Sequence, residues 1–210
     1  KNSIKRISYQ RNKLAECINE ANQEDYIFYS DNDEIPNFDK INLNEEKSKL
    51  IVFKQKLFYY KFNLFCDIVD WYGTKGCKKK NLRTFSWLRE IKPKSYPIYR
   101  IDTLFSNNKY IDLKVVNDGG WHFTQLKNSK DLEAKLMNQE HHDEYKLAKG
   151  KIPKIEDLIK RKTIIYDYNA KSSEYKFSKE FKLKTVSMDF MPQYLKESKQ
   201  KYKGWFDEEF

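Results

Sequence analysis

Cysteine, glycine and proline are scarce in this chain. Six glycines and five prolines in 210 residues leave little room for low-complexity segments. The three cysteines, Cys17, Cys66 and Cys77, are an odd number and form no C-x-x-C pair. We therefore expect neither a disulfide framework nor a cysteine zinc site, and a reducing compartment, the cytoplasm, is favoured.

Long apolar runs are also missing. No stretch approaches the ~18 uncharged apolar residues of a membrane-spanning helix, and the tract 57–69 is interrupted by Lys61, Asn63 and Asp67. The first six residues lack the apolar core of a signal peptide. Since the chain begins with Lys and not Met, we expect it to be a fragment or a processed product.

Aromatic and basic residues, in contrast, are plentiful. The 15 Tyr, 14 Phe and 4 Trp argue against disorder, although 34% of the residues are charged. A chain of 210 residues can bury one good core, so a single domain over residues 1–210 is predicted. The formal charge of +10 favours nucleotide phosphates, other polyanions or an anionic membrane surface, unless it is spread over a solvated surface.

The most informative segment is Ser30-Asp31-Asn32-Asp33-Glu34-Ile35-Pro36. It follows the apolar run 26–29, which predicts a short buried strand. Asp31 and Asp33 then lie where a strand ends, the usual place for function in an open α/β sheet. Two carboxylates separated by one residue can share a divalent cation such as Mn²⁺ or Mg²⁺, which could neutralise the oxygens of a phosphate or diphosphate.

Several kinds of protein place D-x-D after a strand. An EF-hand loop needs Gly and Glu where this chain has Pro36 and Asn42, so that calcium site is excluded. A haloacid-dehalogenase-type phosphatase usually has Thr or Val where this chain has Ile35, and no later Asp-Asp pair completes such a site. A sugar-nucleotide-dependent glycosyltransferase and a solvated acidic turn remain open.

The remaining pattern predicts an α/β fold. A helix over 8–22, with Leu14 and Cys17 on its apolar face, and the strand 26–29 would be the second half of a βαβ unit whose first strand would lie upstream of residue 1. Helices are also expected at 39–47, 82–91, 129–142 (with Ser129 as N-cap), 155–161 and from 192. Strands are expected at 50–53, 98–101, 110–116, 121–126 and 163–166, with 58–62 as a separate element and 71–76 as a loop.

Several short segments occur in order between residues 10 and 200. They are Gln10-Arg11-Asn12, 30–36, Tyr59-Tyr60-x-x-Asn63, Trp71-x-Gly73-Thr74, Gly119-Gly120-Trp121-His122, His141-His142-Asp143-Glu144 and Pro192-x-Tyr194-Leu195. Together they resemble glycosyltransferase family 17, the β-1,4-mannosyl-glycoprotein N-acetylglucosaminyltransferases that add bisecting GlcNAc to N-glycans.

The resemblance implies a GT-A-like, Rossmann-type glycosyltransferase domain. Family members have a further stretch before Gln-Arg-Asn, so we expect this chain to lack the first nucleotide-binding strands. Residues 1–75 would form the D-x-D half and 76–210 the acceptor half. The implied reaction is a metal-dependent, inverting transfer of a sugar such as GlcNAc from a nucleotide-sugar donor such as UDP-GlcNAc to a glycan hydroxyl.

The resemblance also assigns roles to individual residues. The metal ligands would be Asp31, Asp33 and His122, with His141 and His142 as the other candidate histidines. The donor-binding residues would be Arg11, Asn12, Asp31, Glu34 and Trp121, with orientation of the metal loop as the alternative role of Glu34. The general base that deprotonates the acceptor hydroxyl would be Glu144 or Asp143.

Some of these features have a plainer interpretation. Trp121 can be a core aromatic or a platform for a sugar ring. The basic run 75–80 can be solvated, or it can contact donor phosphates or an anionic lipid surface as a peripheral membrane contact. The competing functions are a catalytically idle GT-A-like module that holds glycan or nucleotide, and a phosphatase. No nucleic-acid partner is predicted.

Overall fold

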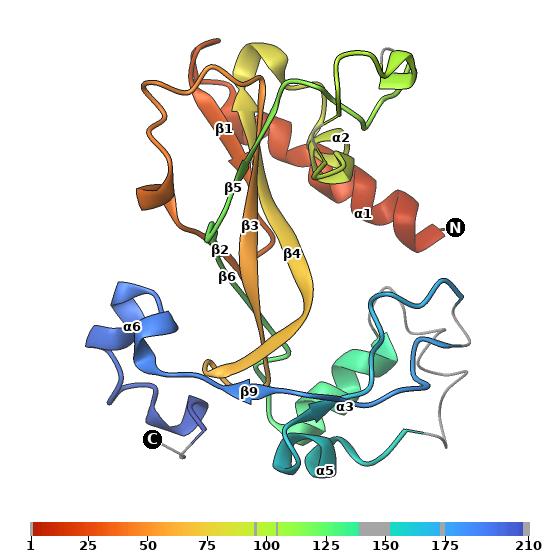
Figure 1. The fold of residues 1–210 in the computed structure, drawn as a ribbon, viewed down its shortest axis with the longest axis vertical. Helices are drawn as coiled ribbons and strands as arrows, with labels where there is room; N and C mark the ends of the chain where they lie inside the picture. Colours follow the sequence, from red (N-terminus) through yellow and green to blue (C-terminus); the bar gives the residue numbers. More distant parts are fainter. Residues whose placement is uncertain (1, 95, 104, 139–151, 173–174, 208–210) are drawn as a thin grey trace. The chain divides into compact units, whose positions relative to one another are not determined.

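The computed structural model describes residues 2–94, 96–103, 105–138, 152–172 and 175–207. These residues form a mixed α/β structure (Figure 1), as the sequence predicts. The main sheet has the strand order β1-β4-β3-β6-β2, with β5 also paired to β3 and β9 to β4. The chain divides into two compact units, Lys1–Gln55 with Trp71–Gly120 and Lys56–Asp70 with Trp121–Phe210, so neither unit is simply the first or the second half of the sequence.

The first unit begins with a helix that differs from the expected one. Helix α1 covers Asn2–Lys13, and the chain then tightens into the 3-10 turn η1, Leu14–Ile18. Arg11 and Lys13 lie in the last turn of α1, where positive charge suits the negative end of a helix. Leu14 and Cys17 are exposed, so the apolar face predicted over 8–22 is wrong for these two residues.

The strand predicted at 26–29 is confirmed as β1, Tyr26–Tyr29. Its neighbour, however, is β4, Leu64–Lys78, which runs antiparallel to it with Tyr29 opposite Lys75. The first strand of the predicted βαβ unit would precede residue 1, so the described residues do not test that pairing. The predicted loop at 71–76 is wrong, because Gly73 and Gly76 lie inside β4. A Cβ on Gly76 would lie 2.2 Å from the ring of Phe28, so this glycine permits close packing and does not form a turn.

Strand β3, Leu50–Tyr59, extends the predicted strand 50–53 into the first two residues of the aromatic tract 58–62, and the rest of the tract is the turn that follows, so it is not a separate element. Two strands run parallel to it: β5, Leu113–Val116, along 50–53, and β6, Gly120–Thr124, along 56–59. The register shifts by two residues between them. Asp118 and Gly120 absorb this shift with φ angles of 48° and 127°, in the region that favours glycine.

Alternate residues of β1 and β3 enter two different cores of the first unit, as expected of strands covered on both faces. One core contains Leu50, Val52 and Ile27 and is covered by helix α2, Phe85–Glu90. The other contains Ile51 and Phe53, with partly buried side chains from β1 and from residues 41 and 43.

Four short elements complete the first unit. They are β2 (Glu34–Pro36), η2 (Phe38–Lys40), η3 (Lys79–Asn81) and η4 (Ile101–Thr103). The helix predicted at 39–47 is thus only one 3-10 turn, begun by the Asn37 side chain, which accepts a hydrogen bond from the Asp39 N–H. The strand predicted at 98–101 is replaced by turns.

The second unit has its own aromatic core, formed by Phe58, Phe123, Met191, Leu195 and Phe206. Its elements after β6 are α3 (Ser129–Asn138), α5 (Ile155–Lys160), β7 (Thr163–Ile164), β8 (Phe181–Lys182), β9 (Lys184–Thr185), η6 (Met188–Phe190), α6 (Gln193–Glu197) and η7 (Lys203–Trp205). The N-cap of α3 is Asn128 and not Ser129, because the Asn128 side chain accepts the Asp131 N–H. Among the described residues, no helix has the length and apolar character needed to cross a membrane.

Gly120 offers a direct test of the backbone at the register shift. A Cβ there would lie 2.0 Å from the Ile35 carbonyl oxygen, at a positive φ. We expect Gly120→Ala to lower the free energy of unfolding by about 2–4 kcal/mol. Urea titration measures the loss. The matched control is Gly204→Ala, where a Cβ meets nothing within 4 Å and a change of no more than about 0.5 kcal/mol is expected. Equal effects would contradict the close approach.

Candidate functional site

The chain turns sharply directly after β1, over residues 31–34, which we call the acidic turn. The Glu34 N–H donates to the Asp31 carbonyl oxygen at 3.0 Å. The Glu34 carboxylate in turn accepts the Asp31 N–H at 3.1 Å. The turn is thus closed by two reciprocal hydrogen bonds, so the position of the two aspartates is set by the chain itself.

Glu34 is the buried anchor of the acidic turn. Its side chain is 0% exposed, and both guanidinium N–H groups of Arg89 donate to its two oxygens at 3.0 and 2.8 Å. The Trp71 indole N–H donates to the same carboxylate at 2.8 Å. A planar fork on a carboxylate is the strongest common ion-pair geometry, and it offsets the cost of burying the charge. Glu34, predicted to orient this loop or to bind the donor, is enclosed and positions the loop.

Arg89, at the end of α2, connects three parts of the first unit. Besides Glu34 it reaches the Gly73 carbonyl oxygen at 2.8 Å and the Asp31 carboxylate at 2.7 Å. Burial opposes its charge, but the hydrogen bonds and charge of Glu34 and the charge of Asp31 keep the Arg89 pKa above its ordinary value. A Cβ on Gly73 would lie 2.6 Å from the Glu34 carboxyl carbon, so glycine is needed beside this pair.

Asp31 is joined to α1 through a tyrosine. The Tyr29 hydroxyl donates to Asp31 at 2.6 Å and accepts from Arg11 Nε at 3.2 Å. Burial raises the pKa of Tyr29, and the hydrogen bond to Asp31 raises it further. Arg11, predicted to bind the donor, therefore lies one hydroxyl away from the first aspartate.

Asn12, the neighbour of Arg11, contacts helix α2. Its side-chain oxygen accepts the Ser86 N–H at 3.0 Å, and the Ser86 hydroxyl donates to the Ser8 carbonyl oxygen at 3.0 Å. These bonds tie α1 to the start of the helix that carries Arg89. In this geometry the side-chain oxygen of Asn12 positions α2.

The Trp71-x-Gly73-Thr74 segment meets the same turn from β4. The hydroxyls of Ser30 and Thr74 are 2.5 Å apart, and the Gln55 side chain donates to Thr74 at 3.2 Å. Lys75 is also buried, with its ammonium donating to the carbonyl oxygens of Arg89 and Ile91 at 2.5 and 2.6 Å. Burial, together with the nearby Arg89 charge, lowers the pKa of Lys75 to about 8. Lys75 is therefore not part of a solvated run.

The two glycines of the Gly119-to-His122 segment also pack on this region. The Asn37 N–H donates to the Gly119 carbonyl oxygen at 2.9 Å, and Gly120 lies against the Ile35 carbonyl oxygen. Parts of four separately identified segments thus meet in the first unit, around residues 30–37. Searches of protein-family models, of curated proteins and of solved structures found no match to this chain.

The other predicted site residues belong to the second unit or lie outside the described residues. Trp121 and His122 belong to the second unit, where the Trp121 indole N–H donates to the Phe190 carbonyl oxygen at 2.5 Å and its ring packs against the aromatic core. His122 is buried on β6, opposite Leu57. The segment from His141 to Glu144, with both candidate bases, lies outside the described residues.

The residues of the acidic turn limit the kind of divalent-cation site that could form there. Among the described residues, no group of three His, Cys, Asp or Glu side chains could enclose a metal ion. Asp31 already contacts Tyr29 and Arg89, and Glu34 is saturated. Mg²⁺-type sites, however, often use one or two carboxylates, retained waters and substrate phosphates. An all-protein cage is not found among the described residues, so a cation held by the D-x-D pair would need an open site of this kind.

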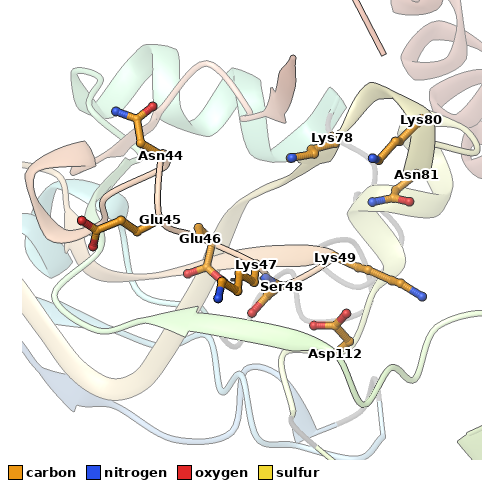
Figure 2. A pocket seen from close by; sticks show the side chains of 10 residues that line it. All are labelled: Asn44, Glu45, Glu46, Lys47, Ser48, Lys49, Lys78, Lys80, Asn81 and Asp112. Carbon is orange, nitrogen blue, oxygen red and sulfur yellow. Dashed lines mark hydrogen bonds between the residues drawn. The ribbon is translucent and has the colours of Figure 1, made fainter. Parts of the chain in front are cut away.

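A cavity of about 840 Å³ also lies in the first unit (Figure 2), and none of the residues that line it belongs to these segments. Its charged lining residues are four lysines and three acids, Lys47, Lys49, Lys78, Lys80, Glu45, Glu46 and Asp112. Lys78 and Lys80 also reach Glu24 at 2.9 and 2.5 Å. Because the charges nearly cancel, this cavity has no strong preference for an anion.

The importance of Glu34 for the fold can be tested by removing its charge. Glu34→Gln leaves the buried Arg89 without its main counter-charge, so we expect a loss of about 3–5 kcal/mol in the free energy of unfolding. Urea unfolding measures it. Glu24→Gln is the control, since the Glu24 side chain is 62% exposed and its ion pairs with lysines are solvated. A midpoint for Glu34→Gln as high as that of the control would contradict the anchoring role.

From the lowered pKa of Lys75 we predict how the stability of the protein depends on pH. Its folded pKa of about 8 lies below the usual 10.5, so between these values the unfolded chain binds more protons and stability rises with pH. Relative to Lys75→Met, the wild-type protein should gain up to about 1.4 kcal/mol per pH unit between pH 8 and 9.5. Urea titrations of both proteins at several pH values measure this difference. A difference that is flat or falls with pH would contradict the depressed pKa.

Proposed function

We propose that this chain is the D-x-D-bearing part of a GT-A-like, inverting glycosyltransferase. It would transfer a sugar, GlcNAc in the first instance, from UDP-GlcNAc to a hydroxyl of a glycan acceptor. The observation that supports this most is the meeting of four segments around the acidic turn. Arg11, Asp31, Trp71 and Gly120 come from distant parts of the sequence and are held about one loop by hydrogen bonds and close packing.

The proposed site depends on preorganisation. Asp31 and Asp33 would hold a divalent metal, Mn²⁺ or Mg²⁺, which when bound supplies positive charge for the diphosphate leaving group. The chain's own contribution is a rigid turn, because Glu34, Arg89 and Trp71 fix it before any donor arrives. Groups that are already in place cost no reorganisation when charge develops on the leaving oxygen.

The acceptor needs a base on the opposite face of the donor sugar. Asp143 or Glu144 would take the proton of the acceptor hydroxyl as its oxygen bonds to the anomeric carbon. The bond from that carbon to the diphosphate breaks at the same time, and UDP leaves with the bonding electron pair. Attack from the face opposite the leaving group inverts the anomeric centre.

A second candidate is a GT-A-like module that binds nucleotide or glycan without turnover. The contacts of Asp31 favour it, because Tyr29 and Arg89 already use this carboxylate. A phosphatase is the third candidate. Manganese-dependent hydrolysis of UDP-GlcNAc, compared with other sugar nucleotides and with a simple phosphate monoester, separates the three. Turnover of the sugar nucleotide supports the transferase, binding alone supports the module, and turnover of the monoester supports the phosphatase.

Asp33→Ala is the sharpest single test. We expect it to abolish transfer and Mn²⁺-dependent binding of UDP-GlcNAc, because it removes one of two proposed metal ligands, and to leave the fold intact. Donor binding is measured by calorimetry with and without Mn²⁺. The control is Asn32→Ala, the exposed residue between the two aspartates, which should retain both activities. Transfer by Asp33→Ala at the wild-type rate would exclude the metal role.

A further inference from the structure

A loop in the first unit exposes an unusual amount of apolar surface. In the described residues of 92–108 (92–94, 96–103 and 105–108), which we call the apolar loop, Ile98, Tyr99, Ile101 and Phe105 are 86%, 80%, 69% and 85% exposed. Single exposed apolar side chains are ordinary, but four large ones within eight residues form a patch of the kind that marks an interaction site. Figure 1 shows this light-green segment extending away from α2.

The base of the apolar loop is closed. The Lys92 N–H donates to the Asn108 carbonyl oxygen at 2.8 Å, where the two ends meet. The Trp87 indole N–H, from α2, donates to the Asn107 carbonyl oxygen at 2.9 Å. The segment is thus a compact loop with adjacent ends, a type that is frequently functional.

The loop also has an interior of its own. Tyr96 is buried, and the buried Thr103 hydroxyl donates to the Arg100 carbonyl oxygen at 2.6 Å. Asp102 accepts from Arg100 at 2.6 and 2.8 Å and from Lys109 at 2.8 Å. These bonds shape the backbone around η4, so the apolar side chains point outward from an ordered turn.

The charges around the loop have mainly one sign. Between positions 92 and 109 the basic residues are Lys92, Lys94, Arg100 and Lys109, and the acidic residue is Asp102. The chain as a whole carries +10. Each basic residue near an anionic bilayer adds attraction, and this attraction weakens with salt.

We propose that the apolar loop inserts into the surface of an anionic lipid bilayer. Ile98, Ile101 and Phe105 would enter the boundary between headgroups and acyl chains, with Tyr99 at headgroup level. A bilayer explains the patch better than a protein partner does. A stable protein interface uses roughly 20–30 residues a side, whereas a bilayer can accept a small protruding tip surrounded by cations. The inference is independent of the proposed transferase function.

The test is flotation of the full chain with vesicles of phosphatidylcholine and phosphatidylserine. We expect the wild-type protein to float, less so at high salt or with phosphatidylcholine alone. Ile98→Asp/Phe105→Asp should bind at least about tenfold more weakly, because it places two charges in the inserted tip. The matched control is Ile4→Asp, on α1, where the native side chain is 59% exposed and binding should be unchanged.

A second measurement reports insertion directly. Brominated acyl chains should quench the tryptophan fluorescence of Ile98→Trp more strongly than that of the wild-type protein. The proposal is overturned if the wild-type protein does not float, if Ile98→Asp/Phe105→Asp floats equally well, or if no added quenching is seen. It is also overturned if sedimentation shows a dimer that the double variant abolishes while vesicle binding is absent, since a second copy would then cover the loop.

Discussion

The ion pair between Glu34 and Arg89 is the contact on which the rest of the first unit depends. A fully buried carboxylate is tolerable only when donors replace its water, and here two guanidinium N–H groups and one indole N–H do so. Arg89 further bonds to Gly73 and Asp31, so one guanidinium joins α2, β4 and the acidic turn. The turn is rigid because the buried Glu34 carboxylate can satisfy its charge only against Arg89 and Trp71.

The same pair constrains the backbone that surrounds it. Glu34 can lie beside β4 only because Gly73 has no side chain, and Gly120 lets β6 begin directly against the Ile35 carbonyl. Glycine inside a strand usually marks a bulge or such a close approach of another chain segment. At Gly73 glycine is needed because a side chain would not fit. At Gly120 glycine is needed for this reason and also because φ is positive.

The large positive charge serves several different purposes. The ammonium group of Lys75, on β4, is buried against the carbonyl oxygens at the end of α2. Lys78 and Lys80 pair with Glu24, so much of the basic run 75–80 has structural partners. Around the apolar loop, Lys92, Lys94 and Arg100 are exposed, and they lie in the same segment as the exposed apolar side chains. Helix α2 links the two regions, since Arg89 in its last turn reaches the acidic turn and Lys92 begins the apolar loop.

Local patterns were sufficient for β1, the start of β3, α2 and α5, because apolar runs and caps act over a few residues. They failed at 71–76, where two glycines imitate a turn inside a strand, and at 98–101, where apolar residues imitate a strand on an exposed loop. The roles of Arg89 and Gln55 had no local signal at all. The sequence by itself determined the short elements and the segments that stand out. Only the tertiary structure decided that Glu34 pairs with Arg89, 55 positions away. The physical reason is that a buried carboxylate must accept hydrogen bonds from whichever donors lie next to it in the folded chain.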